Sequence, residues 1–230
     1  MISTNEPVMK KKKAAFPVRV WRYSVRKCKA AAYHTILAIP YFHFAKNTRH
    51  TPVPCTLRMW FMQKVVGFNK KAYWPVHFTS KINLPKNIII GIETSPGYEP
   101  GCYIQGIGKV YIGDYTLIAQ NVGIISSNHD IYDNSKHDHS SVVKIGNYCW
   151  LGMNSIVLPG VQLGDFTIVG AGAVVTKSFP DGYCVIGGNP ARVIKQLQRE
   201  KCVRYRNEPE YVGYMSKSRF DQFRKEVLKA

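Results

Sequence analysis

Three of the seven histidines in this 230-residue chain fall within one polar segment, residues 126–140, which reads SSNHDIYDNSKHDHS. An imidazole accepts a proton near neutral pH, so a histidine here could be the general base that activates a hydroxyl nucleophile. His129, between Asn128 and Asp130, opens the segment and is the candidate for that base. Asp130 could orient the imidazole or shape an acceptor pocket, and a turn-forming role fits it equally well.

Metal binding and covalent catalysis are the other chemistries that the residue types allow. His137, Asp138 and His139 could hold a metal ion, but alternate residues of a loop more often point apart into solvent, so no metal is expected. The six cysteines show no CxxC spacing, which disfavours a zinc site and a compact disulfide framework. Cys149 could attack a thioester, yet it falls at an inward-facing position of a repeat and is expected to be a core residue.

That repeat has a period of six residues, and it is the element that must position the polar segment. Aliphatic residues recur at this step in two series, Ile112, Ile118, Ile124 and Ile145, Leu151, Val157, Leu163, Val169, Val175. Residues six apart are rotated by about 240° around an α-helix, so they cannot share one face. The pattern predicts a triangular solenoid in which each hexad forms a short strand and a corner, with its aliphatic side chain inward. We expect the glycine after each aliphatic to supply the corner's unusual backbone angles.

The step of six fails between Ile124 and Ile145, whose separation is not a multiple of six. A loop over 126–142 therefore leaves the coil at this point. Repeat proteins carry such insertions on one face, often the face that binds ligands. The sequence thus predicts that His129 stands on a loop that the coil presents.

Four segments of the repeat resemble a known family. They read VKIGNYCWLG (143–152), IVLPGVQLGD (156–165), TIVGAGAVVTK (167–177) and GGNPARVI (187–194). Together they resemble the hexapeptide-repeat acyltransferases, and most of all the branch that acetylates sugars, which includes maltose and galactoside acetyltransferases and the O-acetyltransferases of surface polysaccharides. The resemblance implies a mainly β fold, a left-handed parallel β-helix with helical segments at its N-terminal and C-terminal ends.

The same resemblance implies an activity and an acceptor site. A histidine at this point of the coil is the family's catalytic base, so His129 would take the proton of a sugar hydroxyl while that oxygen attacks the acetyl group of acetyl-CoA. Direct transfer of this kind needs no metal, and a backbone N–H could stabilise the oxyanion. Gln105 aligns approximately with a position where sugar-acetylating relatives carry an acceptor-binding Asn. Asn128, Asp130 and Gln105 are accordingly expected to contact the acceptor.

For acetyl-CoA, the resemblance implies a groove between the coils of neighbouring subunits in a homotrimer. Seven residues stand at the matching positions: Trp150, Gly152, Ala171, Thr176, Lys177, Arg192 and Lys195. Arg192 and Lys195 could meet the phosphates of the nucleotide, and Trp150 could pack near the pantetheine. Each candidate also has an alternative role. Gly152 and Ala171 could simply be corner positions, Trp150 could be a subunit contact, and the two cations could lie on a solvated helix face.

Charge divides the chain unevenly. The net charge is +18, and residues 1–90 hold 17 Lys and Arg against one acid, Glu6. We expect a basic helical region at 1–75, the β-helix acyltransferase domain at 76–190, and a C-terminal helical segment at 191–230, with one helix after Pro190 and another around 218–228. Residues 18–29 and 56–68 can form basic amphipathic helices, which could attach peripherally to an anionic membrane or cap the open end of the coil.

Several other classes are disfavoured. The N-terminus lacks the apolar run of a secretory signal, and no stretch is apolar and long enough to span a bilayer, so a cytoplasmic location, at most at the inner face of the membrane, is expected. No nucleic-acid-binding motif accompanies the basic residues, so no nucleic-acid partner is expected. An N-acetyltransferase acting on an amino sugar and a non-catalytic β-helix scaffold remain the alternative functions.

Overall fold

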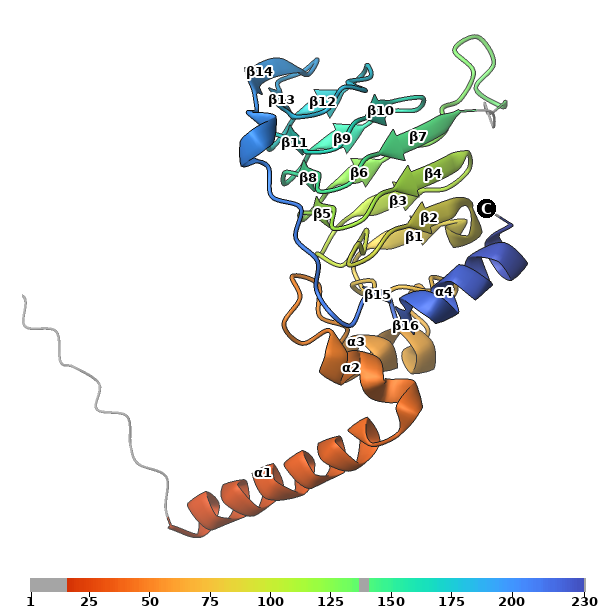
Figure 1. The fold of residues 1–230 in the computed structure, drawn as a ribbon. Coiled ribbons are helices and arrows are strands. Elements are labelled where there is room, and N and C mark those ends of the chain that lie inside the picture. Colours follow the sequence, from red (N-terminus) through yellow and green to blue (C-terminus); the bar gives the residue numbers. More distant parts are fainter. Residues whose placement is uncertain (1–15, 137–140, 230) are drawn as a thin grey trace, which may run out of the picture. The chain divides into compact units, whose positions relative to one another are not determined.

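The computed structural model describes residues 16–136 and 141–229, and the chain divides into two compact units, residues 1–43 and 44–230 (Figure 1). In the first unit, α1 spans Phe16–Leu37 and is followed by the short 3-10 helix η1, Pro40–Phe42. Pro17 suits the first turn of a helix, because its missing N–H has no intrahelical partner there. Within the described residues, no helix has the length and apolar character needed to cross a membrane.

The second unit begins with short helices that cap the coil. Helix α2 spans His43–Asn47, and α3, Leu57–Trp60, continues directly into η2, Phe61–Val66. Fully buried Gln63 fixes this segment, because its Nε2 donates to the carbonyls of Ala72 and Trp74 at 3.0 and 2.9 Å and its Oε1 accepts from Val76 N and the Tyr214 hydroxyl. Helices therefore form in both predicted basic stretches, and the second of them serves as a cap.

The C-terminal end of the chain returns to the same cap. A hairpin of β15 (Tyr211–Val212) and β16 (Met215–Ser216) leads into α4 (Lys217–Phe223) and η5 (Arg224–Leu228). Buried Val212 and Phe220 join the core that also contains Trp74, and the Phe220 ring stacks on Tyr73 at 5.7 Å. The helix predicted around 218–228 is confirmed.

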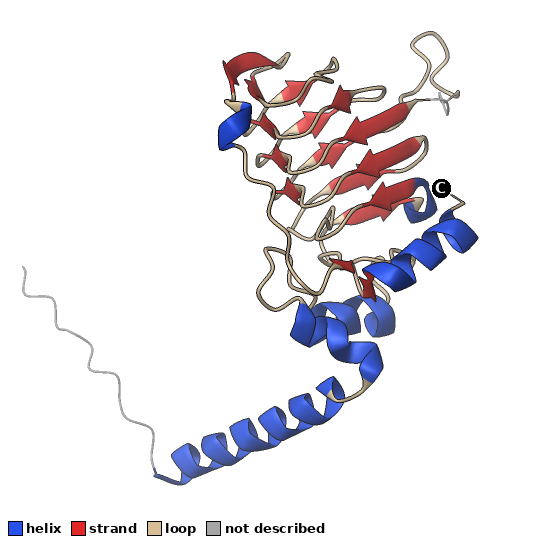
Figure 2. Cartoon of the chain, in the orientation of Figure 1, coloured by secondary structure: helices blue, strands red, loops and turns tan. Residues whose placement is uncertain are grey.

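Between the cap and the far end of the unit, short strands stack into three sheets whose strands, apart from the last one, run parallel, as Figure 2 shows. The chain passes through sheets A, B and C in turn, which is a parallel β-helix, as predicted. Sheet A contains β1 (Lys81–Asn83), β3 (Tyr103–Gln105), β6 (Gly123–Ile124), β9 (Ile156–Val157) and β12 (Val174–Val175); sheet B contains β2 (Ile88–Ile90), β4 (Lys109–Ile112), β7 (Val142–Ile145) and β10 (Gln162–Leu163); sheet C contains β5 (Leu117–Ile118), β8 (Trp150–Leu151), β11 (Thr167–Val169), β13 (Cys184–Gly187) and β14 (Arg192–Gln196).

The register confirms the six-residue repeat. Lys144 pairs with Gln162 and Trp150 pairs with Ile168 in the next coil, so one coil is three hexads. The aliphatic residue of each hexad points inward: Ile145, Leu151 and Val157 are 3%, 0% and 0% exposed. Burial of this stack, at about 25 cal/mol per Å² of apolar surface, is the main force that holds the coils together.

The glycines that follow the aliphatics serve a different purpose from the one predicted. The left-handed backbone falls two residues later, as at Tyr148 (φ 54°) and Phe166 (φ 56°). A Cβ on Gly146 would instead lie 2.6 Å from the Asp165 backbone nitrogen of the next coil. These glycines are needed because the backbones of successive coils approach closely, and not for their own dihedral angles.

The helix predicted directly after Pro190 is wrong, so segment 191–230 is only partly helical. Residues 192–196 form β14, which runs antiparallel to β13. Strand β13 is the last parallel strand of sheet C, and its edge amide and carbonyl groups need partners. Val193 and Ile194 are β-branched and favour an extended strand, and this strand supplies the hydrogen-bond partners of β13.

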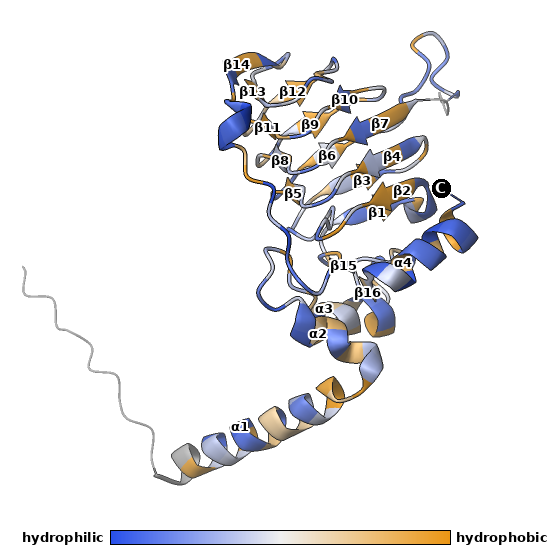
Figure 3. Ribbon diagram, viewed as in Figure 1, coloured by the Kyte–Doolittle hydropathy of each residue, from blue (hydrophilic) through white to orange (hydrophobic). Residues whose placement is uncertain are grey.

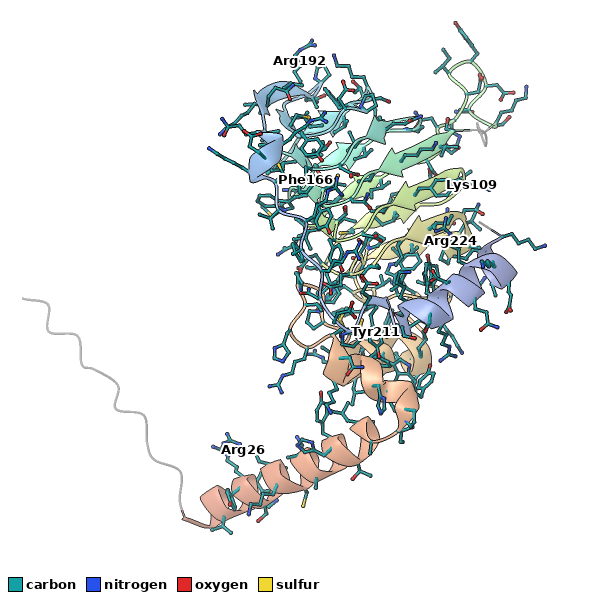
Figure 4. All side chains as sticks on the ribbon, in the orientation of Figure 1. Arg26, Lys109, Phe166, Arg192, Tyr211 and Arg224 are labelled. Carbon is teal, nitrogen blue, oxygen red and sulfur yellow. The ribbon has the colours of Figure 1, made fainter. Side chains whose placement is uncertain are left out.

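An aromatic column lines the corner between sheets B and C, which we call the supported corner. Successive rings of Tyr115, Tyr148, Phe166 and Tyr183 stack with centroids 5.2, 5.0 and 5.1 Å apart. The C-terminal segment passes along this column before it reaches β15. The guanidinium of its Arg204 lies 5.1 Å from the ring of Phe166, and Figure 4 labels Phe166. One strap of chain thus covers several coils at once.

Candidate functional site

The predicted loop is an insertion into an otherwise regular coil. Lys144 pairs with Tyr111 in the preceding coil and with Gln162 in the next, so the first of these two steps along the chain is nearly twice as long as the second. The extra residues fall between β6 of sheet A and β7 of sheet B, and the loop projects from the coil in Figure 1. We call this position, between sheets A and B, the loop corner.

Gln105 holds the base of the loop. Its side chain is 9% exposed, and Oε1 accepts hydrogen bonds from the backbone nitrogens of Ser126 (3.1 Å) and Ser127 (2.8 Å). The Ser126 hydroxyl in turn donates to the Gln105 carbonyl and accepts from Gly108 N. The predicted acceptor contact of Gln105 stays a prediction, while its bonds show that it fixes the segment just before His129.

His129 is exposed, and one backbone group sets the proton position on its ring. Nδ1 lies 2.6 Å from the carbonyl oxygen of Asn134. A carbonyl can only accept, so Nδ1 must carry the hydrogen. In the neutral ring the lone pair is therefore on Nε2, which is the form that can take a proton from an acceptor hydroxyl.

Asp130 acts within the loop backbone. Its Oδ1 accepts from the backbone nitrogens of Tyr132 (2.8 Å) and Asp133 (2.9 Å), and its own N–H donates to the Lys136 carbonyl. These bonds favour the turn-forming role, since the Asn134 carbonyl supplies the partner of the His129 Nδ1. Asn128 is exposed beside His129.

The carboxylate of Asp133 closes the same turn. Lys136 Nζ lies 2.8 Å from it, and this hydrogen bond, with those from Ser135, lowers the pKa of Asp133. His137, Asp138 and His139 lie outside the described residues. In the part of the chain that the structure describes, no group of three or more His, Cys, Asp or Glu side chains could hold a metal ion.

Two of the coenzyme candidates stack at the corner between sheets C and A. Gly152 follows β8 and Ala171 follows β11, in successive coils, and Gly152 N donates to Val169 O at 2.8 Å. A Cβ on Gly152 would lie 2.8 Å from Ala171 N, so the close approach of the next coil requires glycine here, and its predicted contact with coenzyme A stays a prediction. Trp150, just before the same corner, is 53% exposed.

Trp150 also borders an open cavity of about 380 Å³. Its other walls include Val53, Leu117, Gln120 and Met153. Met153 is 46% exposed and lies at the same corner. Met153 was not predicted as a site residue, although it follows Gly152 directly in the repeat.

The remaining candidates lie elsewhere on the coil. Thr176 and Lys177 follow β12 of sheet A, so they belong to the loop corner, two coils beyond the base of the loop. Arg192 and Lys195 are exposed on β14, which is a strand rather than the predicted helix. Figure 4 labels Arg192 at the end of the coil opposite the cap. Within one chain, sheet A therefore separates His129 from the corner of Gly152 and Ala171.

Cys149 is confirmed as a core residue. It is 1% exposed, and burial raises the pKa of its thiol to about 12. Its Sγ lies 3.3 Å from the Gly164 carbonyl of the next coil. A thiol that is buried and protonated cannot serve as a nucleophile at neutral pH.

Comparison with known proteins agrees with this geometry. Residues 143–177 match the family described as bacterial transferase hexapeptide (six repeats). The chain is 39% identical over 173 residues to WbbJ of Escherichia coli K12, provisionally named as an O-acetyl transferase of lipopolysaccharide biosynthesis, and the match covers 68% of this chain and 83% of that protein. The chain belongs to the hexapeptide-repeat acetyltransferases.

Two further relatives of this hexapeptide-repeat acetyltransferase act on sugars according to their names. The galactoside O-acetyltransferase of Escherichia coli K12 is 32% identical over 141 residues, which cover 59% of this chain and 65% of that protein. The crystal structure of a maltose O-acetyltransferase from Clostridium difficile 630 superposes with a TM-score of 0.50 at 30% identity, covering 71% of this chain and 89% of that chain.

Proposed function

We propose that this acetyltransferase moves an acetyl group from acetyl-CoA to a sugar hydroxyl, of a surface polysaccharide or its precursor, with His129 as the general base. The observation that carries the proposal is the hydrogen bond from His129 Nδ1 to the Asn134 carbonyl. It leaves the proton-accepting lone pair on Nε2, on a loop inserted into an acetyltransferase coil.

The reaction is a direct transfer in this proposal. Nε2 takes the hydroxyl proton as the oxygen attacks the thioester carbonyl carbon, and a backbone N–H stabilises the tetrahedral oxyanion. The carbon–sulfur bond then breaks, and the imidazolium returns the proton to the leaving thiolate. The products are the acetyl ester and coenzyme A. Burial of Cys149 supports a route without an acyl-enzyme.

The proposed site is shared between subunits of a homotrimer. His129 and the corner of Gly152 and Ala171 lie on opposite sides of sheet A, so a neighbouring coil is the simplest means of joining base and thioester. The exposed Trp150 and Met153 support a contact at that corner. We assign the pantetheine to a groove between this corner and the neighbouring coil, with Thr176 and Lys177 along the path of the pantetheine. We assign the nucleotide phosphates to the exposed cations Arg192 and Lys195.

The acceptor is proposed to be a carbohydrate, bound beside His129 by Asn128 and the loop that Asp130 shapes. The names of the galactoside, maltose and lipopolysaccharide relatives support this class of acceptor. A cytosolic site of action suits a supply of acetyl-CoA.

A thiol-release assay with acetyl-CoA and a panel of sugars tests the proposal. His129→Ala should lower the turnover rate by about 10²- to 10⁴-fold, as expected for loss of a general base. His50→Ala, which removes an exposed histidine of the second unit outside the loop, is the matched control and should keep wild-type turnover. If His129→Ala turns over as fast as wild type, His129 is not the general base. A product acetylated on an amine would identify an N-acetyltransferase instead.

A further inference from the structure

The N-terminal part of the chain, up to Glu93, carries charged side chains of almost one sign. No Asp or Glu occurs between Glu6 and Glu93, while Lys and Arg recur throughout. The ion pairs found among the described residues use Asp133, Asp165 and Asp221, so their acids all come from the later part of the chain. None of the described Lys and Arg residues before Glu93 takes part in these ion pairs, and exposed ones such as Arg22 and Lys70 can meet an external anionic partner.

Helix α1 combines this charge with an apolar face. Trp21, Val25, Cys28, Ala32 and Ile36 follow the spacing that places residues on one side of a helix. Trp21 is 66% exposed and is not covered by the rest of its own unit. Exposed cations flank this face, including Arg22, Lys29 and Arg26, which is labelled in Figure 4, and Figure 3 shows apolar and hydrophilic residues interleaved along the helix.

A second exposed surface, the aromatic patch, lies on the cap of the second unit. It consists of Phe61, Val65, Phe68 and Phe78, which are 51%, 56%, 44% and 46% exposed. The Phe68 and Phe78 rings lie 6.1 Å apart. The cations Arg58, Lys70 and Lys71 are close to the patch in sequence. Large apolar side chains in such numbers on the surface of one chain indicate an interaction site.

The patch is held in place from beneath. Phe61 and Val65 lie on η2, and buried Gln63 between them is hydrogen-bonded to the body of the unit. An adjoining cavity of about 390 Å³, lined by Met59, Met62 and Phe78 among others, adds apolar space beside it. Because the inner face of η2 is fixed in this way, Phe61 and Val65 are held on its outer face.

We propose that α1 and the aromatic patch bind the surface of an anionic lipid bilayer, with their aromatic and aliphatic side chains inserted at the headgroup level and their Lys and Arg on the lipid phosphates. Interfacial helices combine an apolar face with flanking cations in this way, and each cation near an anionic surface strengthens binding about fivefold. A nucleic acid would engage the cations and could stack on aromatic rings, but it would leave aliphatic side chains such as Val65 in water, whereas a bilayer interface buries both kinds of apolar side chain. The proposal goes beyond the acetyl-transfer reaction and does not depend on it.

Flotation of the full chain with phosphatidylcholine vesicles, with and without phosphatidylglycerol, tests this proposal. Binding should require phosphatidylglycerol and fall with added salt. Arg22→Glu with Arg26→Glu should weaken it about tenfold or more, and Phe61→Ala with Val65→Ala should weaken it separately. Lys201→Glu with Val203→Ala, exposed residues far along the chain, is the matched control and should bind as wild type.

Other outcomes overturn the proposal. Equal binding to both vesicles, or salt-sensitive binding to an oligonucleotide with none to vesicles, would exclude anionic lipid as the partner. Unchanged vesicle binding by the Arg22 and Arg26 variant would show that α1 does not bind the bilayer, and unchanged binding by the Phe61 and Val65 variant would show the same for the aromatic patch. If the Phe61 and Val65 variant changes only the mass measured by light scattering, the patch is a contact between copies of this chain. Thiol release with a soluble sugar should be the same in all variants, so this test is separate from that of His129.

Discussion

The two corners that flank sheet B differ in almost every respect, although the same repeat builds both. At the supported corner, four aromatic rings stack along successive coils and the strap carrying Arg204 covers them. At the loop corner the chain leaves the coil for the inserted segment, and His129 stands exposed. In the proposed mechanism, stability and chemistry thus belong to different corners of the same coil.

The largest expected effect comes from removing the loop. Deletion of residues 126–140 restores the step of three hexads, and Val142 then takes the position that Gly160 (φ 78°) holds in the next coil. The deletion should therefore be combined with Val142→Gly. We expect a folded coil without measurable thiol release, followed by circular dichroism and the acetyl-CoA assay. Loss of cooperative unfolding would show that the loop also supports the coil, and the contrast between the corners would fail.

At the supported corner, Phe166→Ala should do the opposite. The ring is 9% exposed and packs against Tyr148, Tyr183 and Arg204. Its loss should lower the free energy of unfolding by about 3 kcal/mol, measured by urea denaturation, while turnover per folded molecule stays at the wild-type value. A large fall in turnover with unchanged stability would mean that this corner takes part in catalysis.

A pair of glycines separates close packing from backbone strain. Gly146→Ala, at the supported corner, places a Cβ against the backbone of the next coil and should cost about 3 kcal/mol. Gly160→Ala, at the loop corner, meets no atom within 4 Å but has φ of 78°, so only the strain of about 1 kcal/mol applies. Thermal unfolding measures both, and equal losses would contradict the close approach of the coils.

The smallest effect concerns acid stability. Burial would raise the pKa of Asp165, but hydrogen bonds from Asn147 and the charge of Arg204 outweigh it, so the pKa lies below its ordinary value. This carboxylate therefore stabilises the fold above the unfolded value of about 3.9, and the contribution is lost as pH falls through the folded pKa. Asp165→Asn keeps the residue type found at Asn147 in the preceding coil and should cost less than about 1 kcal/mol at neutral pH, because Arg204 is half exposed.

Urea denaturation at a series of pH values distinguishes the two proteins. The stability of wild type should fall toward that of Asp165→Asn as the pH drops below about 4. A difference in the free energy of unfolding between the two proteins that persists at low pH would show that the carboxylate charge contributes nothing at this corner.

The repeat and the inserted loop could be predicted from the sequence because each depends on spacing. The inward positions of Ile145 and Leu151 and the burial of Cys149 follow from a period of six, and the structure confirms them. The role of Gly146 could not be predicted, since it depends on the distance to Asp165 in the neighbouring coil. Strand β14 was missed because a helix and an edge strand compete for Val193 and Ile194, and only the open edge of β13 decides between them.

The partner of His129 lay beyond sequence reasoning for a similar reason. The Asn134 group that fixes the ring is a backbone carbonyl, which every residue carries, so no residue type signals it. Gln105 was assigned to the acceptor by resemblance, and its bonds to Ser126 and Ser127 became visible only when the loop was placed on the coil.

A crystal structure with coenzyme A bound is the most direct test of His129 as the base. We expect the thiol sulfur to lie beside Nε2 of His129, from the same chain or a neighbouring one, while Nδ1 still donates to the Asn134 carbonyl. A sulfur bound away from every His129, or a ring turned so that Nδ1 faces it, would contradict the assignment of this histidine as the base.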